Sequence, residues 1–286
     1  MKISKLDTYP RGGALRCMPV SVFEGMGGGV SSPQEQPFDP EAAVSAALLD
    51  MTQEIARPNY RLRIGRVGVI PEGSIVVVTG GAKQGKSQWC NIMAATMLKG
   101  QKFGIIERET PPFTMCYFDT EQTPFDVQTN MKRLLNAAGI EPSKAASNGF
   151  FPFMLRPYTA EQRKLIIDKT LELYKPDIVF IDGIRDLLHD FNDIKEVDAL
   201  ITWLLQTTTK MSNANFFVVI HTNEGSEKMR GHLGSELYNK CGDRFDVTKQ
   251  GGHFKVKHIC KHMAMLEPFL FHINEDGHLQ PYEETK

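Results

Sequence analysis

A glycine-rich segment that ends in a lysine and a serine is the part of this sequence with the clearest chemistry. Residues 80–87 read Gly-Gly-Ala-Lys-Gln-Gly-Lys-Ser and match G-x-x-x-x-G-K-[ST], the pattern of a phosphate-binding loop. In such a loop, backbone N–H groups and the positive end of the following helix bind anionic oxygens. The predicted nucleotide-binding residues are Gly80, Gly81, Ala82, Lys83, Gln84, Gly85, Lys86, Ser87 and Gln88.

The lysine and the serine of this loop have separate predicted roles. Lys86 would reach the β- and γ-phosphates of a nucleoside triphosphate, and Ser87 would give an oxygen ligand to Mg²⁺. The apolar run 75–79 before the loop predicts a buried strand, and 88–98 after it predicts a helix. A strand, a glycine loop and a helix in this order support the motif over a glycine-rich turn that binds nothing.

Polar residues follow three further apolar runs, where strands of a parallel sheet would end. Asp182 follows the run 178–181 and would hold Mg²⁺ opposite Ser87, although it could also simply cap a strand end. Glu121 follows 114–118 and is the best candidate to polarise the attacking water, with Asp119 competing for this role. The alternative for Glu121 is a solvated acid at the start of the next helix.

His221 follows the apolar run 216–220 and could sense the γ-phosphate; otherwise it is a histidine of the core. The segment after it, 224–234, is rich in glycine and carries Lys228, Arg230 and His232. A basic loop beside a phosphate sensor suits contact with nucleic acid, and an ordinary solvated loop is the alternative. The segment 183–196, with Arg185, is a second candidate of weaker basic character.

Apolar strands that alternate with helices predict an α/β fold with a mostly parallel, twisted sheet covered on both faces. Three later strands, joined by glycine turns, read as antiparallel and would complete the sheet. The expected strands are 75–79, 114–118, 150–155, 178–181 and 216–220, then 245–249, 254–260 and 269–273; the expected helices are 86–98, 124–138, 160–174 and 197–211.

The sequence before this domain divides into two parts. Residues 1–38 are rich in glycine and predicted to be disordered. Residues 39–58 predict a linker helix with an apolar stripe of Val44, Leu48, Met51 and Ile55. The stripe could pack on its own domain or dock on a neighbouring subunit. The ATPase domain would then span residues 59–286.

Composition places few limits on function. The chain has 286 residues, 41% of them hydrophobic, and a net charge of −1, so no bulk field attracts nucleic acid. Its five cysteines are widely spaced, which favours reduced thiols and a cytoplasmic location. No apolar run reaches the roughly 18–20 residues needed to cross a bilayer, so no membrane contact is expected.

Together these motifs resemble RecA-type ATPases, and the chain is most similar to the RepA-like branch of ring-forming replicative helicases of plasmids and mobile elements. The resemblance covers residues 60–280. It rests on 80–87, on Tyr-Phe-Asp-Thr-Glu at 117–121, on 178–186, and on His-Thr-Asn at 221–223 followed by Arg-Gly-His-Leu-Gly-Ser at 230–235. The implied fold is a RecA-like P-loop domain, and the implied cofactors are ATP and Mg²⁺.

The resemblance further implies a homohexameric ring that hydrolyses ATP between subunits and moves along single-stranded DNA, with a primase as a possible partner. An arginine of the neighbouring subunit would complete each site, and Arg244 is in the corresponding place; Lys257 and Lys261 are weaker candidates. Two alternatives stay open: a filament-forming recombination or repair ATPase, and a nucleotide-switched, DNA-associated assembly factor that does not unwind.

Overall fold

The structure is a computed structural model that describes residues 38–109, 113–211, 214–223, 225–226, 228–260 and 266–282. The predicted disorder of residues 1–38 thus lies almost wholly outside the described residues. Two compact units are distinguished, Met1–Arg57 and Pro58–Lys286, and each is considered by itself.

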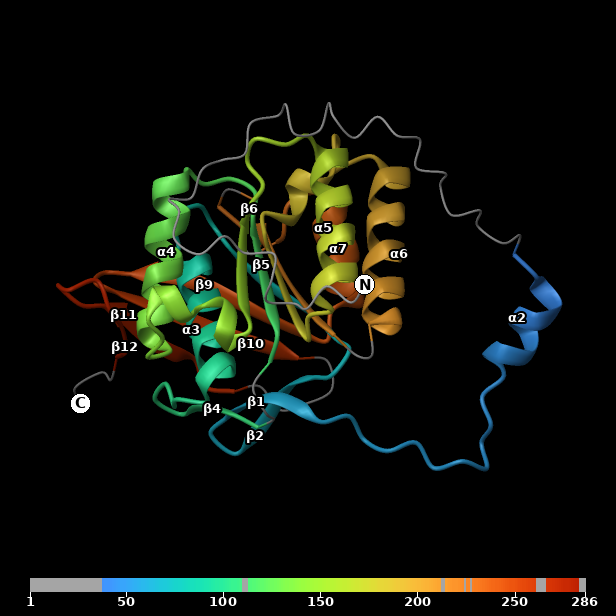
Figure 1. Ribbon diagram of the computed structural model, residues 1–286, viewed down its shortest axis with the longest axis horizontal. Coiled ribbons are helices and arrows are strands. Elements are labelled where there is room, and N and C mark those ends of the chain that lie inside the picture. The colour runs from blue at the N-terminus through green and yellow to red at the C-terminus, as the bar shows by residue number, and fades with distance from the viewer. Residues whose placement is uncertain are drawn as a thin grey trace, which may run out of the picture. The chain divides into compact units, whose positions relative to one another are not determined.

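The second unit is built on a nine-stranded sheet with the order β12-β11-β10-β9-β3-β8-β7-β5-β6 (Figure 1). The six strands from β9 to β6 are parallel, and β10, β11 and β12 extend the sheet in antiparallel fashion. The strands are β3 (Ile75–Gly80), β5 (Met115–Asp119), β6 (Phe150–Met154), β7 (Ile178–Asp182), β8 (Asn215–His221), β9 (Asp243–Gln250), β10 (His253–Cys260), β11 (Phe269–Ile273) and β12 (Leu279–Pro281).

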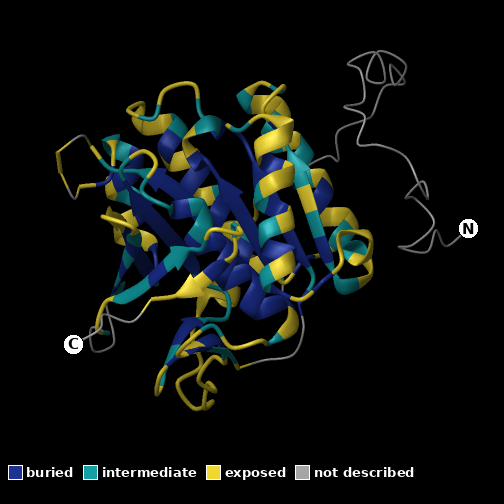
Figure 2. Cartoon of the chain, turned by 90° about the vertical axis from the view of Figure 1, so that its left-hand side faces the viewer, coloured by how far each residue is buried: buried dark blue, intermediate teal, exposed yellow. Residues whose placement is uncertain are grey.

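Helices cover both faces of this sheet, so the central strands are buried on both sides (Figures 1 and 2). One face packs against α3 (Lys86–Lys99) and α4 (Pro124–Ala137), around the buried ring of Trp89. The other face packs against α5 (Ala160–Tyr174), α6 (Ile194–Lys210) and α7 (Gly231–Lys240). Short 3₁₀ turns lie at η1 (Pro142–Lys144), η2 (Ala146–Asn148) and η3 (Ile184–Leu187).

A small antiparallel sheet packs against the hydrophobic core formed with α3. It consists of β2 (Val67–Pro71), β1 (Tyr60–Ile64) and β4 (Ile106–Arg108). The Nε of Arg61 donates to Oδ1 of buried Asn215 at 2.8 Å, and NH1 of Arg61 pairs with Glu72 at 3.0 Å. These bonds join the small sheet to the start of β8, so it belongs to the same folded unit.

The mostly parallel sheet, its covering helices and the antiparallel strands near the C-terminus confirm the predicted fold class. The short strands β4 and β12 were not predicted, because three residues are too few to show a period. The helix α7 begins at Gly231, within the segment 224–234 that was expected to be a loop, and it buries Leu233 and Leu237 one turn apart. Among the described helices, none has the length and apolar character to span a membrane.

The linker helix is shorter than predicted. The α2 helix spans Pro40–Ala47, capped by the carboxylate of Asp39, and Leu48 is already extended at φ −69°, ψ 117°. The prediction of a helix over 39–58 is therefore wrong beyond residue 47. None of its residues is buried, and helices well below about 12–15 residues are marginal without tertiary packing. Leu48 and Met51 are 79% and 83% exposed.

We expect a protein that begins at Pro58 to fold with a Tm within about 2 °C of the full chain, because α2 contributes no buried residue. Differential scanning calorimetry tests this. A protein that begins at Glu72 is the control. It lacks β1 and β2 and should unfold far earlier, since Leu62 and Val69 are buried. Equal losses in both proteins would contradict the division into two units.

Candidate functional site

The predicted phosphate-binding loop lies between β3 and α3, and two of its glycines have no room for a side chain. A Cβ on Gly80 would lie 2.2 Å from the carbonyl oxygen of Val247. A Cβ on Gly85, which has φ +92°, would lie 2.4 Å from the ring of Phe254. Gly85 is also the N-cap of α3 and provides no side-chain acceptor. The first N–H groups of α3 are therefore left to an outside anion.

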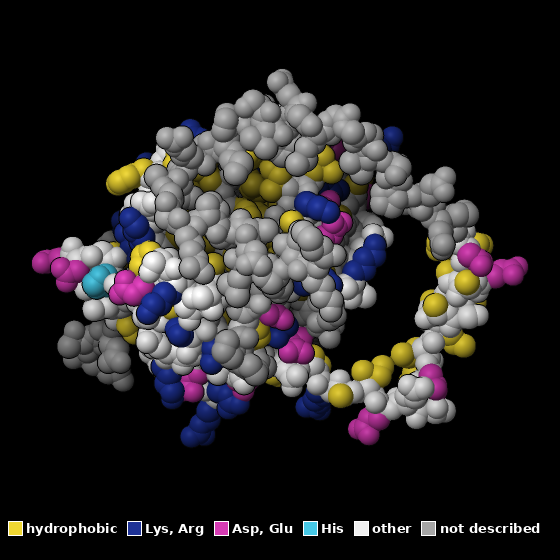
Figure 3. All heavy atoms as spheres, in the orientation of Figure 1, with side chains coloured by type: hydrophobic (Ala, Val, Ile, Leu, Met, Phe, Trp, Pro, Cys, Tyr) yellow, Lys and Arg dark blue, Asp and Glu magenta, His cyan; other side chains and the backbone are white. Residues whose placement is uncertain are grey.

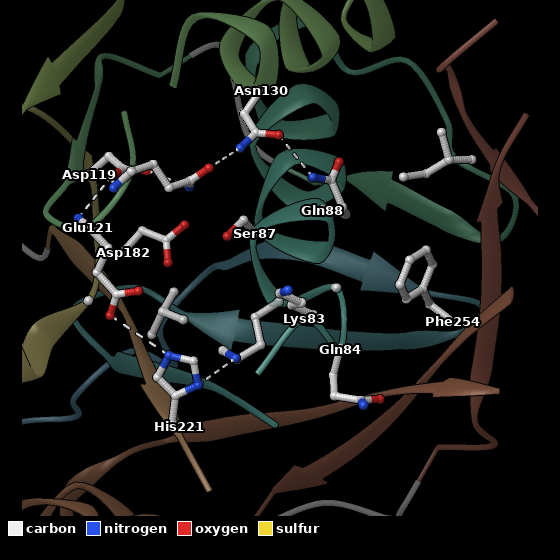
Figure 4. Close-up of a pocket in the computed structure, with 16 residues that line it drawn as sticks. Lys83, Gln84, Ser87, Gln88, Asp119, Glu121, Asn130, Asp182, His221 and Phe254 are labelled. Atoms are coloured by element: carbon white, nitrogen blue, oxygen red, sulfur yellow. Dashed lines mark hydrogen bonds and ion pairs between the residues drawn. The ribbon is translucent and has the colours of Figure 1, made fainter. Parts of the chain in front are cut away.

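These N–H groups border a cavity of about 550 Å³. Loop residues 83–88 form one wall, and the ends of β5, β7 and β8 form the opposite wall. Figure 4 shows the carboxylates of Glu121 and Asp182 and the ring of His221 beyond these strand ends, on the same side of the cavity as Ser87. Phe254 and Ile273, from the antiparallel strands, add an apolar side. The volume and this lining fit a nucleotide, with phosphates at the polar end.

Lys86 is buried, and its ammonium group is held by three acceptors. Its Nζ donates to the carbonyls of Gly80 at 3.1 Å and Gly81 at 2.7 Å, and lies 3.1 Å from Nδ1 of His221. Burial lowers the pKa of Lys86, and the carboxylates of Asp182 and Glu121 oppose this shift. The ammonium of Lys86 is thus bonded to neutral acceptors, and it could exchange these bonds for bonds to a phosphate.

Lys86 determines which ring nitrogen of His221 carries a proton, and His221 in turn contacts Glu121. Because an ammonium can only donate, Nδ1 of His221 is the acceptor and Nε2 carries the proton. That Nε2 lies 3.8 Å from Oε1 of Glu121. The interaction with His221 lowers the pKa of Glu121, so this carboxylate is ionised and able to accept a proton. Figure 4 shows the contact between His221 and Glu121 as a dashed line.

Asp182 lies at the end of β7, beside Ser87. Burial raises the pKa of its carboxyl, and hydrogen bonds from the hydroxyls of Ser87 and Tyr117 oppose the shift; the Tyr117 bond is 3.0 Å long. A buried carboxylate next to a serine hydroxyl is a hard oxygen pair of the kind that Mg²⁺ prefers. These two residues therefore fit the predicted metal role, in which Mg²⁺ would offset charge on the phosphates.

Asp119 is buried, and both oxygens of its carboxylate already accept hydrogen bonds. Its Oδ1 accepts from the N–H groups of Glu121 at 3.1 Å and Gln122 at 2.8 Å, and its Oδ2 accepts from Nε2 of Gln122 at 2.6 Å. Burial raises its pKa to about 6. The side chain of Glu121, by contrast, is 51% exposed toward the cavity. The geometry therefore favours Glu121 over Asp119 as the residue that polarises water.

Arg244, expected to act across a subunit interface, does not line this cavity. It lies on β9, is 9% exposed, and forms a double contact with Asp246 at 2.5 Å and 2.8 Å. Its guanidinium also lies over the ring of Tyr238. A role in a neighbouring site stays a prediction, and it would require the pair with Asp246 to open. Of the weaker candidates, Lys257 lies opposite Asp246 on β10, and Lys261 is outside the described residues.

The basic segment after β8 begins close to the nucleotide cavity. Arg230 donates its N–H to the carbonyl of His221 at 3.0 Å, and Thr222 pairs with Met229. Lys228 and Arg230 are exposed, as predicted for a loop. His232 is not in the loop; it lies in the first turn of α7, because α7 begins at Gly231. Contact with nucleic acid through these residues stays a prediction.

Several side chains of the site were not predicted from the sequence. Phe254 and Ile273 come from strands more than 160 residues after the phosphate loop, and no local pattern marks them. Gln122 and Asn130 also line the cavity. Asn130 lies on the predicted helix 124–138, but nothing in the local sequence marks it as a residue of the cavity.

We expect Asp182→Asn to raise the Mg²⁺ concentration needed for nucleotide binding by at least about tenfold, because one charged oxygen ligand is removed. Titration of a fluorescent nucleotide at stepped Mg²⁺ concentrations measures this. Asp190→Asn, an exposed acid after the same strand, is the control. An unchanged Mg²⁺ requirement in Asp182→Asn would contradict the metal assignment.

Comparison with known proteins identifies a family and supports the fold. A family model described as an AAA domain, AAA_25, matches residues 37–227, more than half of the chain. No curated protein sequence matches. The structure is similar to the flagellar accessory protein FlaH from Methanocaldococcus jannaschii, with TM-score 0.52 and 18% identity over 72% of this chain and 88% of that one.

It is also similar to a KaiC-like protein from Pyrococcus horikoshii OT3, with TM-score 0.52 and 16% identity over 79% of this chain and 100% of that one. At these identities the likeness concerns the fold, which is the RecA-like arrangement expected from the phosphate loop and the strand order. Family membership comes from the match over residues 37–227. The chain belongs to the AAA-domain family that this model describes, as a P-loop ATPase of the RecA type.

Proposed function

We propose that this ATPase is a DNA-dependent ring motor, a helicase of the RepA-like kind that serves a plasmid or mobile element. The observation that carries the proposal is the direct path from the nucleotide cavity to the basic segment. Lys86 contacts His221, and the carbonyl of His221 accepts the N–H of Arg230. A change at the phosphate end thus moves the element that would hold DNA.

The hydrolytic step uses groups that the cavity already presents. Glu121 orients a water for attack on the γ-phosphorus and accepts its proton. Lys86 leaves the carbonyls of the loop and binds the β- and γ-phosphate oxygens. Ser87 and Asp182 would hold Mg²⁺, which would supply positive charge to offset that of the phosphates. His221 separates from Lys86 when the triphosphate binds, and this separation is the signal to the loop.

The DNA-binding surface would combine the segments after β7 and β8. The guanidinium groups of Arg185 and Arg230 lie 4.4 Å and 5.3 Å from the ring centre of Phe191. A small pocket beside this cluster is lined by Glu121 and His221. Because cations already engage the ring of Phe191, we expect contact with DNA phosphates rather than stacking on bases.

The charge distribution also favours a local grip. On the face shown in Figure 3, the described Lys and Arg side chains lie among Asp and Glu side chains, in keeping with the net charge of −1. A broad electrostatic attraction to DNA is therefore not part of the proposal. The motor would hold one strand in the channel of a ring, where loops of several subunits act together.

Self-association is part of the proposal. The unit before Pro58 exposes a series of apolar side chains, which are Phe38, Val44, Leu48, Leu49, Met51 and Ile55. Exposed apolar runs of this kind mark interaction surfaces, and a neighbouring subunit is the partner proposed here. Arg244 of one subunit would reach the cavity of the next after leaving Asp246.

We expect Glu121→Gln to lower kcat for ATP by at least about 100-fold while the Kd for ATP changes little, because only proton transfer and water alignment are affected. A coupled phosphate-release assay and a nucleotide-binding titration measure the two quantities. Glu141→Gln, an exposed acid near the end of α4, serves as control. Normal turnover in Glu121→Gln would remove this residue from the mechanism.

For the DNA surface, we expect single-stranded DNA to stimulate the ATPase rate and Arg230→Ala to weaken DNA binding. The slope of log K against log salt should fall by roughly 0.7 for each phosphate that the variant no longer neutralises. Lys132→Ala, an exposed cation on α4, is the matched control. Negative-stain images should show rings. An ATPase rate that DNA does not change, together with images of monomers only, would contradict the proposed motor function.

A nucleotide-switched assembly factor is the second candidate. It is favoured by the structural similarity to a flagellar accessory protein, and by the engagement of Phe191 with cations instead of an open aromatic surface. Such a factor would form rings when ATP is bound but would not separate strands. An unwinding assay on forked DNA distinguishes the two, because only the motor opens the duplex.

A further inference from the structure

A chain of hydrogen bonds along one wall of the nucleotide cavity has no role in the mechanism described so far. NH1 of Arg133 donates to Oε1 of Gln88 at 3.1 Å, and Nε2 of Gln88 donates to Oδ1 of Asn130 at 3.0 Å. Nδ2 of Asn130 donates to Oε1 of Gln122 at 2.7 Å, and Nε2 of Gln122 donates to Oδ2 of Asp119 at 2.6 Å. Figure 4 shows the link between Gln88 and Asn130 as a dashed line.

The two ends of the chain fix its direction. A guanidinium has only donors, so Gln88 must turn its oxygen toward Arg133; a carboxylate has only acceptors, so Gln122 must turn its nitrogen toward Asp119. Each amide between them then has a single orientation that satisfies its neighbours. Hydrogen bonds aligned between a cation and an anion polarise one another and strengthen the whole series.

This amide chain joins the two elements whose separation matters for hydrolysis. Gln88 follows Ser87 directly, in the first turn of α3. At the other end, Asp119 accepts the backbone N–H of Glu121 at 3.1 Å. The helix α4 lies between the two ends and carries Asn130. The position of Glu121 relative to the phosphate-binding loop is therefore held by side chains of the cavity wall that are hydrogen-bonded to one another.

We propose that Asp119, Gln122 and Asn130 are positioning residues, which hold Glu121 at the distance from the phosphate-binding loop that hydrolysis of a nucleoside triphosphate requires. This inference rests on the proposed ATPase mechanism with Glu121 as base. In this proposal Asp119 positions Glu121, although the place of Asp119 after the strand would also suit a general base. Errors of about 1 Å in the placement of a reacting group can cost roughly 100-fold in rate.

A swap of the two chemical groups at one link tests this assignment. In Asp119→Asn an amide N–H must face another donor, and in Gln122→Glu two carboxylates face each other. In the double variant, Asn at 119 donates to Glu at 122, which still accepts from Asn130. Every hydrogen bond and the net charge are then restored, but position 119 has no carboxylate.

We expect each single variant to lose about 10- to 100-fold in kcat with the Kd for ATP little changed, and the double variant to recover most of the rate. Steady-state turnover and fluorescent-nucleotide titration measure the two effects. A double variant as slow as Asp119→Asn would overturn the proposal, since Asp119 would then act through its own carboxylate. So would single variants with normal kcat.

A second comparison covers the case in which a single variant fails to fold. Asn130→Asp keeps the acceptor for Gln88 but puts a carboxylate where Gln122 needs a donor, whereas Gln128→Glu adds the same charge on the exposed side of α4. Only Asn130→Asp should lower kcat, and equal rates would overturn the proposal. Wild-type protein without any ATP hydrolysis would instead refute the proposed function itself, and this inference with it.

Discussion

The buried ammonium of Lys86 is the charge on which the rest of the site depends. Removing a cation from water is costly, and here two backbone carbonyls and the ring nitrogen of His221 offset part of that cost. All three acceptors are neutral, and the nearby carboxylates of Asp182 and Glu121 act from a distance. A triphosphate is a far better partner for this ammonium. The site therefore favours an anion, and we expect a bound phosphate to replace the contact between Lys86 and His221.

The sheet topology turns this local preference into a site. Because β3, β8, β7 and β5 are adjacent and parallel, their carboxyl ends meet at one edge and deliver Lys86, His221, Asp182 and Glu121 to the same cavity. Neighbouring strands also couple these groups. The carbonyl that ends β8 belongs to His221 and holds Arg230, so the nucleotide and the basic segment share one strand end.

The parts of this arrangement that local sequence encodes were predictable. Apolar runs that end in Asp182 or His221 mark both a strand and the group it presents, and the loop pattern identifies Lys86. Long-range contacts were not predictable, since Phe254 reaches the cavity from the antiparallel strands and Arg244 pairs with Asp246 instead of facing outward. The length of the linker helix was predicted wrongly for another reason. Its apolar period continues past Ala47, but no residue of this segment is buried, and only the turns next to the Asp39 cap are helical.

Asp119 and Glu121 are only two residues apart, yet their different burial suits them to different roles in this site. Asp119 is enclosed, accepts three hydrogen bonds and has its pKa raised to about 6, mainly by burial. Glu121 opens to the cavity, and its interaction with His221 lowers its pKa. A base for water must be ionised and must reach the substrate, and only Glu121 meets both conditions. Asp119 accepts its three hydrogen bonds from the turn that carries Glu121, so its proposed contribution to catalysis is the position of its neighbour.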